Sequence, residues 1–290
     1  TPYLVEGDDI VIEKRRKPLC NVLNIIKGNY YAKSEGLIIE EKDLDYLVKN
    51  EPNAKKWIKL LIGADEFINN RKRYCLWLVD CPPDELRKMP LVMERVNRVR
   101  EDRLKSTDKG MQNLAPIRFR ETNNPDKCIV IPVVSSEKRP YIPIGFIDKN
   151  TISTNGNLII PNGDLFLFGQ LTSLMHMAWV KYTCGRLKSD YRYSKDLVYN
   201  NYPFPKNVSE KQKKAVEEKA QNVLNIRSQF SDCSLADLYD PLSMPPNLKK
   251  AHQELDKAVD NCYGSKLFKN DKERIEFLFG LYEEYLNTQK

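Results

Sequence analysis

The chain has 290 residues, of which 41% are hydrophobic and 30% charged, and its formal net charge is +7. This composition suits a globular protein of one large or two smaller domains, and no run approaches the 18 apolar residues of a membrane helix. Residues 206–290 carry 14 Lys and Arg against 14 Asp and Glu, so the positive excess lies before residue 206. A basic segment suits an anionic partner, but many solvated proteins are equally basic.

Cysteine and histidine usage limits the metal chemistry of the chain. None of the seven cysteines stands in a Cys-x-x-Cys pair, and the histidines are His176 and His252. This spacing argues against a zinc site. The chain begins without Met and without the apolar segment of a secretion signal. We therefore expect reduced thiols and part of a longer, cytoplasmic protein.

Residues 1–126 are predicted to mix strands, helices and loops. Residues 41–62 have the apolar spacing of one or two helices. Tyr74–Val79 is a continuous apolar run, which is typical of a strand buried on both faces. From Asp84 to Ser106 an apolar stripe predicts a longer helix, in which Pro90 is tolerated only near a start or a kink.

Basic side chains cover the rest of this longer helix: Arg95, Arg98, Arg100, Arg103 and Lys105. One interpretation is a solvent-exposed helix with ion pairs four residues apart, such as Glu94 with Arg98. The other is a helix lying along a phosphate backbone, with Arg95 and Arg98 as contacts. The sequence favours neither.

The middle of the chain holds two further groups of candidate contacts. Residues 107–126 are predicted to form a loop around a short strand, Ile117–Arg120, which places Arg118 and Arg120 two residues apart. Cys128–Val134 and Tyr141–Phe146 are predicted to pair as a hairpin. Its polar tip would present Ser136, Lys138 and Arg139 to a groove.

A helix and a strand follow. Apolar residues recur from Phe166 to Trp179 at spacings of three and four, which predicts a helix that Gly185 can end in a left-handed conformation. Residues 187–194 then alternate with a period of two, which predicts a strand. On that strand three charged side chains would share one face: Lys188, Asp190 and Arg192.

This charged row has two interpretations. It can be a solvated face with a ladder of charges, the commoner case. It can also be a row of base readers, because Lys donates to guanine, Asp accepts from the amino group of cytosine, and Arg is the commonest partner of guanine.

Beyond Pro205 the sequence predicts helices with balanced charge, beginning at the N-cap Ser209. We therefore expect an α+β fold. A mixed β-sheet recognition domain with packed helices would occupy residues 1–205, and a small all-helical domain residues 206–290.

Three stretches resemble one protein family. Residues 168–205, FGQLTSLMHMAWVKYTCGRLKSDYRYSKDLVYNNYPFP, resemble the end of the target recognition domain of MmeI-like (Type IIL) restriction-modification proteins. Residues 1–22 resemble the segment that joins methyltransferase to recognition domain, and residues 63–81 (GADEFINNRKRYCLWLVDC) a further family signature. Such proteins join an adenine-N6 DNA methyltransferase, a recognition domain and a nuclease, or occur as methyltransferases of the same build.

The resemblance implies roles for particular residues. The family's alternating specificity positions fall on Lys188, Asp190 and Arg192, whereas the flanking aromatics and YNNYPFP are framework. It implies double-stranded DNA and the methyltransferase domain of the same polypeptide as partners, and S-adenosylmethionine as the cofactor of that domain. The helical segment after Pro205 would clasp DNA or brace the recognition domain, and its balanced charge favours bracing.

The catalytic motifs of an adenine methyltransferase are missing from these 290 residues. Cys81-Pro-Pro-Asp84 and Met244-Pro-Pro-Asn247 lack the polar first residue and aromatic last residue that hold a flipped adenine. We find no glycine-rich cofactor loop, and we expect no catalytic, cofactor-binding or metal site in the chain. The competing functions are a basic protein–protein scaffold and an unfamiliar enzyme using Asp and His.

Overall fold

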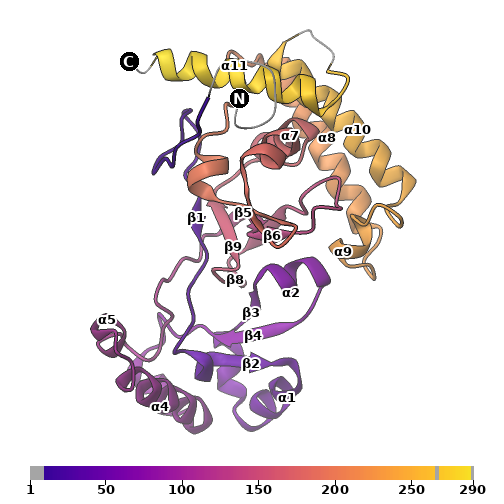
Figure 1. Ribbon diagram of the computed structural model, residues 1–290. Helices are drawn as coiled ribbons and strands as arrows, with labels where there is room; N and C mark the ends of the chain where they lie inside the picture. The colour runs from indigo at the N-terminus through magenta and orange to yellow at the C-terminus, as the bar shows by residue number, and fades with distance from the viewer. Residues whose placement is uncertain (1–9, 265–267, 289–290) are drawn as a thin grey trace. The chain divides into compact units, whose positions relative to one another are not determined.

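The computed structural model describes residues 10–264 and 268–288, so the first nine residues of the predicted joining segment lie outside the described part. The chain forms two compact units, and Figure 1 labels most of their strands and helices. Unit 1 consists of Thr1–Ile26, Lys127–Phe146 and Leu158–Lys290, and unit 2 of Lys27–Asp126 and Ile147–Asn157. The predicted α+β fold is confirmed.

Unit 2 is built on a four-stranded sheet of order β2-β4-β3-β8, in which β8 runs parallel to β3 and the other pairs are antiparallel. Its elements are η1 (Glu35–Leu37), β2 (Ile38–Glu40), α1 (Glu41–Asn50), η2 (Pro52–Trp57), β3 (Ile58–Ile62), α2 (Ala64–Asn69), β4 (Arg73–Leu76), α3 (Pro83–Leu86), α4 (Pro90–Leu104), α5 (Lys109–Gln112) and β8 (Thr151–Ser153).

The predicted helix from Asp84 to Ser106 is divided into α3 and α4. Helix α4 begins at Pro90, where proline is favoured because the first helical residues lack an internal acceptor for their N–H groups. The buried carboxylate of Glu51 accepts from the backbone N–H groups of Leu91 and Val92, the latter at 3.0 Å. The predicted strand Ile117–Arg120 was wrong, because these residues form turns and irregular backbone.

Unit 1 contains a four-stranded sheet of order β1-β9-β5-β7, a three-stranded sheet of order β10-β11-β6, and packed helices. Its elements are β1 (Ile26–Lys27), β5 (Lys127–Pro132), β6 (Val134–Ser135), β7 (Gly145–Asp148), β9 (Asn157–Pro161), α6 (Leu165–Leu171), α7 (Leu174–Thr183), β10 (Gly185–Leu187), β11 (Asp190–Arg192), η3 (Lys195–Tyr199), α8 (Glu210–Ser228), α9 (Leu235–Leu238), α10 (Pro246–Asp260), η4 (Asn261–Tyr263) and α11 (Asp271–Thr288). The chain passes from one unit to the other within β1, β7 and β9.

The predicted helix over Phe166–Trp179 is two helices, α6 and α7. They separate at Ser173, whose Oγ accepts from the backbone N–H of His176 at 3.3 Å and caps α7. Helix α7 ends at Thr183, and Cys184 is already extended, so Gly185 begins β10 instead of ending the helix in a left-handed conformation.

The C-terminal helices share a core with the residues before them. Helix α8 packs on α6 and α10, and α11 packs on α7. A Cβ atom on Gly169 of α6 would lie 2.6 Å from Cγ1 of Val216 on α8, so this close approach requires glycine. The two compact units therefore do not coincide with the two domains expected on either side of Pro205. The domain boundary at Pro205 stays a prediction from the sequence.

The YNNYPFP stretch (residues 199–205) is framework within unit 1. The Asn201 amide donates to the carbonyls of Glu13 and Asp196, both at 2.9 Å, and its Oδ1 accepts from the Tyr282 hydroxyl. The backbone N–H of Leu19 donates to the carbonyl of Asn200 at 2.7 Å. These bonds fix the start of the described chain against the core. No helix within residues 10–264 and 268–288 is long and apolar enough to span a membrane.

Candidate DNA-contact surface

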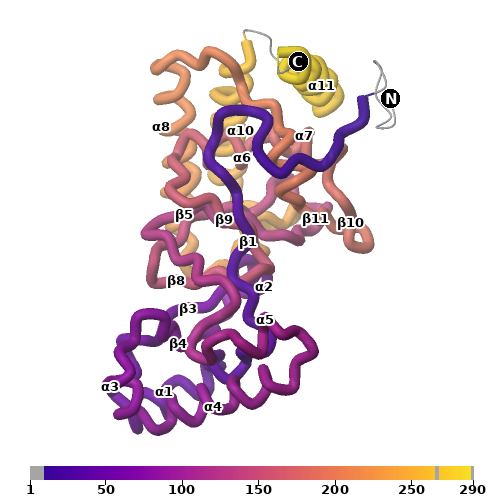
Figure 2. The backbone as a smooth tube through the Cα atoms, turned by 90° about the vertical axis from the view of Figure 1, so that its left-hand side faces the viewer, coloured from indigo at the N-terminus to yellow at the C-terminus, as the bar shows by residue number. Residues whose placement is uncertain are grey.

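The three-stranded sheet of unit 1 brings most of the predicted specificity residues together. Strands β10 and β11 form an antiparallel hairpin in which Leu187 pairs with Asp190 and Gly185 with Arg192. Strand β11 also pairs with β6, joining Tyr191 to Ser135. In Figure 2 the hairpin lies at the right-hand edge of unit 1. The sheet therefore places residues 185–192 beside the segment that follows β6.

The two faces of this sheet differ in burial. Tyr191 is 4% exposed and Ser135 is 2% exposed, so their shared face points into the core. Arg186, which pairs with Tyr191, lies over the Tyr191 ring at 4.3 Å from its centroid. Asp190 and Arg192 occupy the opposite face of β11, where Arg192 is exposed and Asp190 half-buried. Along β11 this outer face is therefore the more exposed one.

Lys188 lies in the turn of the hairpin, so the prediction of one strand over 187–194 was wrong. Residues 188 and 189 form the two-residue connection between β10 and β11, and Lys188 has a positive φ of 55°. Its exposed side chain makes no hydrogen bond or ion pair with the described residues. Lys188 therefore extends from the end of the hairpin, and Asp190 and Arg192 project from one face of β11.

Ser136, Lys138 and Arg139 lie on a turn directly after β6. The backbone N–H of Arg139 donates to the Ser136 carbonyl at 3.2 Å, and the N–H of Lys138 to Ser136 Oγ at 3.4 Å. Lys138 is exposed, whereas Arg139 is half-buried and donates to Ser135 Oγ at 3.4 Å. Burial lowers the pKa of Arg139, while the charges of Asp190 and Asp240 oppose that shift.

Two ties connect the turn to the hairpin. The backbone N–H of Glu137 donates to Asp190 Oδ1 at 3.4 Å. The guanidinium of Arg186 contacts the Glu137 carboxylate at 3.2 Å and donates to the Ser189 carbonyl at 2.9 Å. The sequence interpretation missed Arg186 and Glu137. Arg186 stands two residues before Lys188 and so extends the alternating row of charges. That spacing could have identified Arg186 from the sequence.

The candidates on α4, in unit 2, have local partners. Arg95 is half-buried and donates to the carbonyls of Gly36 at 3.3 Å and Ile38 at 3.0 Å. Arg98 is exposed and contacts the Glu94 carboxylate at 3.1 Å, four residues before it. This arrangement matches the interpretation as a solvent-exposed helix, in which Arg95 supports the backbone around β2.

Arg118 and Arg120 also lie in unit 2, on the irregular segment after α5. Arg118 donates to the carbonyls of Phe119 at 3.3 Å and Arg120 at 3.2 Å. Arg120 is exposed and pairs with the Asp108 carboxylate at 3.3 Å. All of these contacts are with nearby residues. Of the four arginines in unit 2 that were predicted to contact DNA, Arg98 and Arg120 are exposed.

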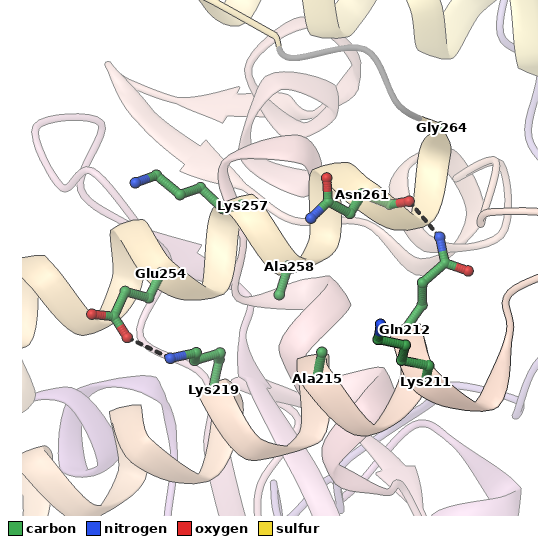
Figure 3. A pocket seen from close by; sticks show the side chains of 9 residues that line it. All are labelled: Lys211, Gln212, Ala215, Lys219, Glu254, Lys257, Ala258, Asn261 and Gly264. Atoms are coloured by element: carbon green, nitrogen blue, oxygen red, sulfur yellow. Dashed lines mark hydrogen bonds and ion pairs between the residues drawn. The ribbon is translucent and has the colours of Figure 1, made fainter.

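A groove in unit 1 contains none of the predicted residues. It has a volume of about 740 Å³ and lies between α8 and α10, as Figure 3 shows. Lys219 pairs with Glu254 at 2.7 Å across it, and the Gln212 amide donates to the Asn261 carbonyl at 2.6 Å. The remaining charges along its walls are Lys211 and Lys257. These two contacts therefore join the helices that form the walls of the groove.

Both histidines are structural. His176 and His252 are fully buried, and each Nε2 lies 2.9 Å from a tyrosine hydroxyl, that of Tyr193 and Tyr239 respectively. Burial lowers the pKa of both imidazoles to about 3. Within residues 10–264 and 268–288, no group of three or more His, Cys, Asp or Glu side chains is placed to hold a metal ion.

These shifts predict that unit 1 loses stability as the pH falls from 6.5 to 5. Each histidine binds a proton below its ordinary pKa of 6.5 in the unfolded chain but only near 3 when folded, so stability present above 6.5 is lost on acidification. Burial raises the pKa of Asp256 to about 7, which acts in the opposite direction from 3.8 upward. Burial also raises the pKa of Asp260, which acts in the same sense as Asp256, so the net loss is smaller than about 1.4 kcal/mol per pH unit.

Urea unfolding at pH 5, 5.5, 6 and 6.5 measures this slope. His176→Gln removes one of the two titrating histidines while keeping a polar side chain opposite Tyr193, so its stability should be nearly constant over the same range. Parallel pH curves for the variant and the wild type would contradict the assignment.

Comparisons with known proteins identify the two domains of the chain. A model of the MmeI target recognition domain matches residues 6–206, and a model of the MmeI C-terminal domain matches residues 208–289. DNA methyltransferase A of Bacillus subtilis (strain 168) is 40% identical over 287 residues, which is 98% of this chain and 32% of that protein.

A solved structure gives the same result. The Type IIL restriction-modification enzyme MmeI in complex with DNA matches 99% of this chain and 38% of its own, with a TM-score of 0.93 and 42% identity. The chain thus spans about a third of the length of these relatives. The chain belongs to the MmeI family, and it comprises that family's target recognition domain and C-terminal domain.

Proposed function

We propose that this chain is the DNA sequence-recognition module of a restriction-modification enzyme. The observation that carries the proposal is the β10–β11 hairpin, where Lys188 is exposed in the turn and Arg192 is exposed beside the half-buried Asp190 on the outer face of β11. Donor groups beside an acceptor are what reading a G·C pair requires. The match to an MmeI structure that contains DNA supports the same assignment.

In this proposal Lys188, Asp190 and Arg192 contact base edges, and the turn after β6 adds Ser136, Lys138 and Arg139. Arg98 and Arg120 are exposed enough to contact phosphates, whereas Arg95 and Arg118 act chiefly on nearby carbonyls. Lys188 and Asp190 together read one G·C pair, with Lys188 on guanine and Asp190 on cytosine. Arg192 reads a neighbouring pair.

Methyl transfer to adenine N6 and the binding of S-adenosylmethionine belong, in this proposal, to a methyltransferase domain of the same polypeptide. The support is the missing adenine-binding tetrad, together with the name and greater length of the Bacillus subtilis relative. The 290 residues alone should therefore incorporate no methyl groups into DNA.

Salt dependence of duplex binding tests the function against a basic protein–protein scaffold. A protein that neutralises phosphates releases counterions, so its affinity falls steeply with salt. We expect dissociation constants of about 10⁻⁴ to 10⁻⁶ M for non-specific duplex at physiological salt. Fluorescence anisotropy with a labelled duplex between 50 and 200 mM NaCl gives the slope. A flat response would favour the scaffold, and Arg98→Ala should reduce the slope by about one if Arg98 contacts a phosphate.

A further inference from the structure

The turn that carries Lys138 and Arg139 is held at both of its ends. At its start, Ser135 is buried and paired with Tyr191 of β11. Glu137 is tied to Asp190 and Arg186, as described above. Ser136–Pro140 is therefore a five-residue connection whose first anchor is the hairpin itself.

Its second anchor is on the C-terminal helix α10. The hydroxyl of Tyr141 donates to Asp256 Oδ2 at 2.7 Å, and the Tyr141 ring stacks on His252 with centroids 4.0 Å apart and planes 22° apart. Tyr141 is 5% exposed. Further along, the carbonyl of Ile144 accepts from Arg227 of α8 at 2.6 Å. The residues that leave the turn thus rest on the helices beyond Pro205.

The anchor on α10 is itself fixed. The other oxygen of Asp256 accepts from the backbone N–H of Leu174 at 2.7 Å, at the first turn of α7. His252 Nε2 lies 2.9 Å from the hydroxyl of Tyr239, whose ring is packed edge-on against it. Asp256 therefore joins three segments far apart in the sequence: the turn, α7 and α10. A buried acceptor with two donors is costly to disturb, because each donor would be left unpaired.

We propose that His252 and Asp256 are positioning residues for the DNA-contact turn Ser136–Arg139, on which they act through Tyr141. Ordering this turn before binding removes part of the conformational entropy lost when the complex forms. The C-terminal helices then contribute to base discrimination without touching a base. The inference rests on the proposed function of the turn, and it assigns to α10 a part in setting specificity.

A matched pair of Tyr→Phe variants tests the positioning role. Tyr141→Phe removes the hydroxyl bonded to Asp256 and keeps the ring on His252. Tyr263→Phe removes a hydroxyl that donates to the Tyr202 hydroxyl at 2.8 Å. Both residues are buried in unit 1, and neither forms a hydrogen bond with residues 136–141. Both variants lose one buried hydrogen bond, so general destabilisation should be similar.

Hydrogen exchange and DNA discrimination are the two readouts. We expect amide exchange in residues 136–141 to rise roughly tenfold in Tyr141→Phe and to stay unchanged in Tyr263→Phe. The ratio of affinities for the recognised duplex and a duplex with one changed base pair should fall only in Tyr141→Phe. Asp256→Leu should give the same pattern, because leucine can accept neither of the two hydrogen bonds.

The variants Lys138→Ala and Arg139→Ala separate this inference from the function on which it rests. If they lower the affinity ratio and Tyr141→Phe leaves exchange and ratio unchanged, the positioning role is overturned and the proposed function stands. If they leave the ratio unchanged, the turn reads no base, and the proposed function of the turn fails with the inference. Equal effects of Tyr141→Phe and Tyr263→Phe on the turn would also overturn the positioning role.

Discussion

Replacing Arg103 with Met should lower the free energy of unfolding of unit 2 by about 3–5 kcal/mol. Arg103 is 1% exposed. Its guanidinium donates five hydrogen bonds of 2.5–3.1 Å, to one hydroxyl and four carbonyls: Ser34 Oγ and the carbonyl oxygens of Lys33, Leu114, Ala115 and Arg118. Methionine fills similar space but leaves these acceptors without a donor. The segments before and after α4 would both lose their common anchor.

A second substitution and a control on the same helix separate geometry from charge. Arg103→Lys keeps the charge but lacks the planar fork that reaches five acceptors, so it should also be strongly destabilising. Arg100→Met removes an exposed guanidinium that donates to Asn97 Oδ1 at 3.1 Å, and should change stability by no more than about 0.5 kcal/mol. Hydrogen exchange in peptides of unit 2 measures both effects. Similar protection in Arg103→Met and Arg100→Met would refute the anchoring role.

Helical spacing could have predicted the burial of Arg103, but not its hydrogen-bond partners. Val92, Val96 and Val99 mark the buried stripe of α4, and residue 103 is the next position on that stripe. The sequence interpretation grouped Arg103 with the exposed arginines because charged residues are almost never fully buried without partners. Its partners are carbonyls of loops on either side of α4, which no local pattern identifies.

The hairpin of residues 185–192 was missed for a different reason. A two-residue hairpin turn usually contains Asn-Gly, Asp-Gly or a similar pair, which makes it recognisable in a sequence. Here the turn residues are Lys188 and Ser189. Because an even number of residues is inserted, the alternation of side chains continues through the turn and resembles one strand. Pairing nevertheless reverses the faces, so Arg186 joins Tyr191 on the inner face while Asp190 joins Leu187 on the outer one.

Other parts were predictable because their causes are local. The α+β class, the apolar stripes of the helices and the N-cap at Ser209 follow from periodicity and capping. The family follows from long matching stretches. The support of the turn by Asp256 could not be predicted in this way, since the bonded residues Tyr141 and Asp256 are 115 positions apart. Such contacts come from tertiary packing, which the sequence pattern leaves undetermined.

Exchanging the charges of Lys188 and Asp190 should invert a base preference. With Lys188→Glu and Asp190→Arg, the donor and the acceptor change places, so a G·C pair should be replaced by C·G at one position of the recognised sequence. Losing either partner alone should reduce discrimination by about 1–3 kcal/mol. Asp190→Ala has an added effect, because Asp190 also accepts from the Glu137 N–H and so supports the neighbouring turn. Lys188→Ala lacks this complication, since the Lys188 side chain makes no hydrogen bond or ion pair within the described chain.

The methylation motif of a methyltransferase that carries this chain as its recognition domain is the measurement, mapped over a whole genome for the wild type, the single variants and the double variant. The matched control is Lys214→Glu with Glu218→Arg, which makes the same exchange at two exposed positions of α8 and should leave the motif unchanged. Arg192→Ala should relax a neighbouring position and leave the inverted pair as it is. An active double variant with the wild-type motif would return Lys188 and Asp190 to the interpretation as a solvated face. In that case Arg192 and the turn after β6 would be the remaining candidates for base contacts.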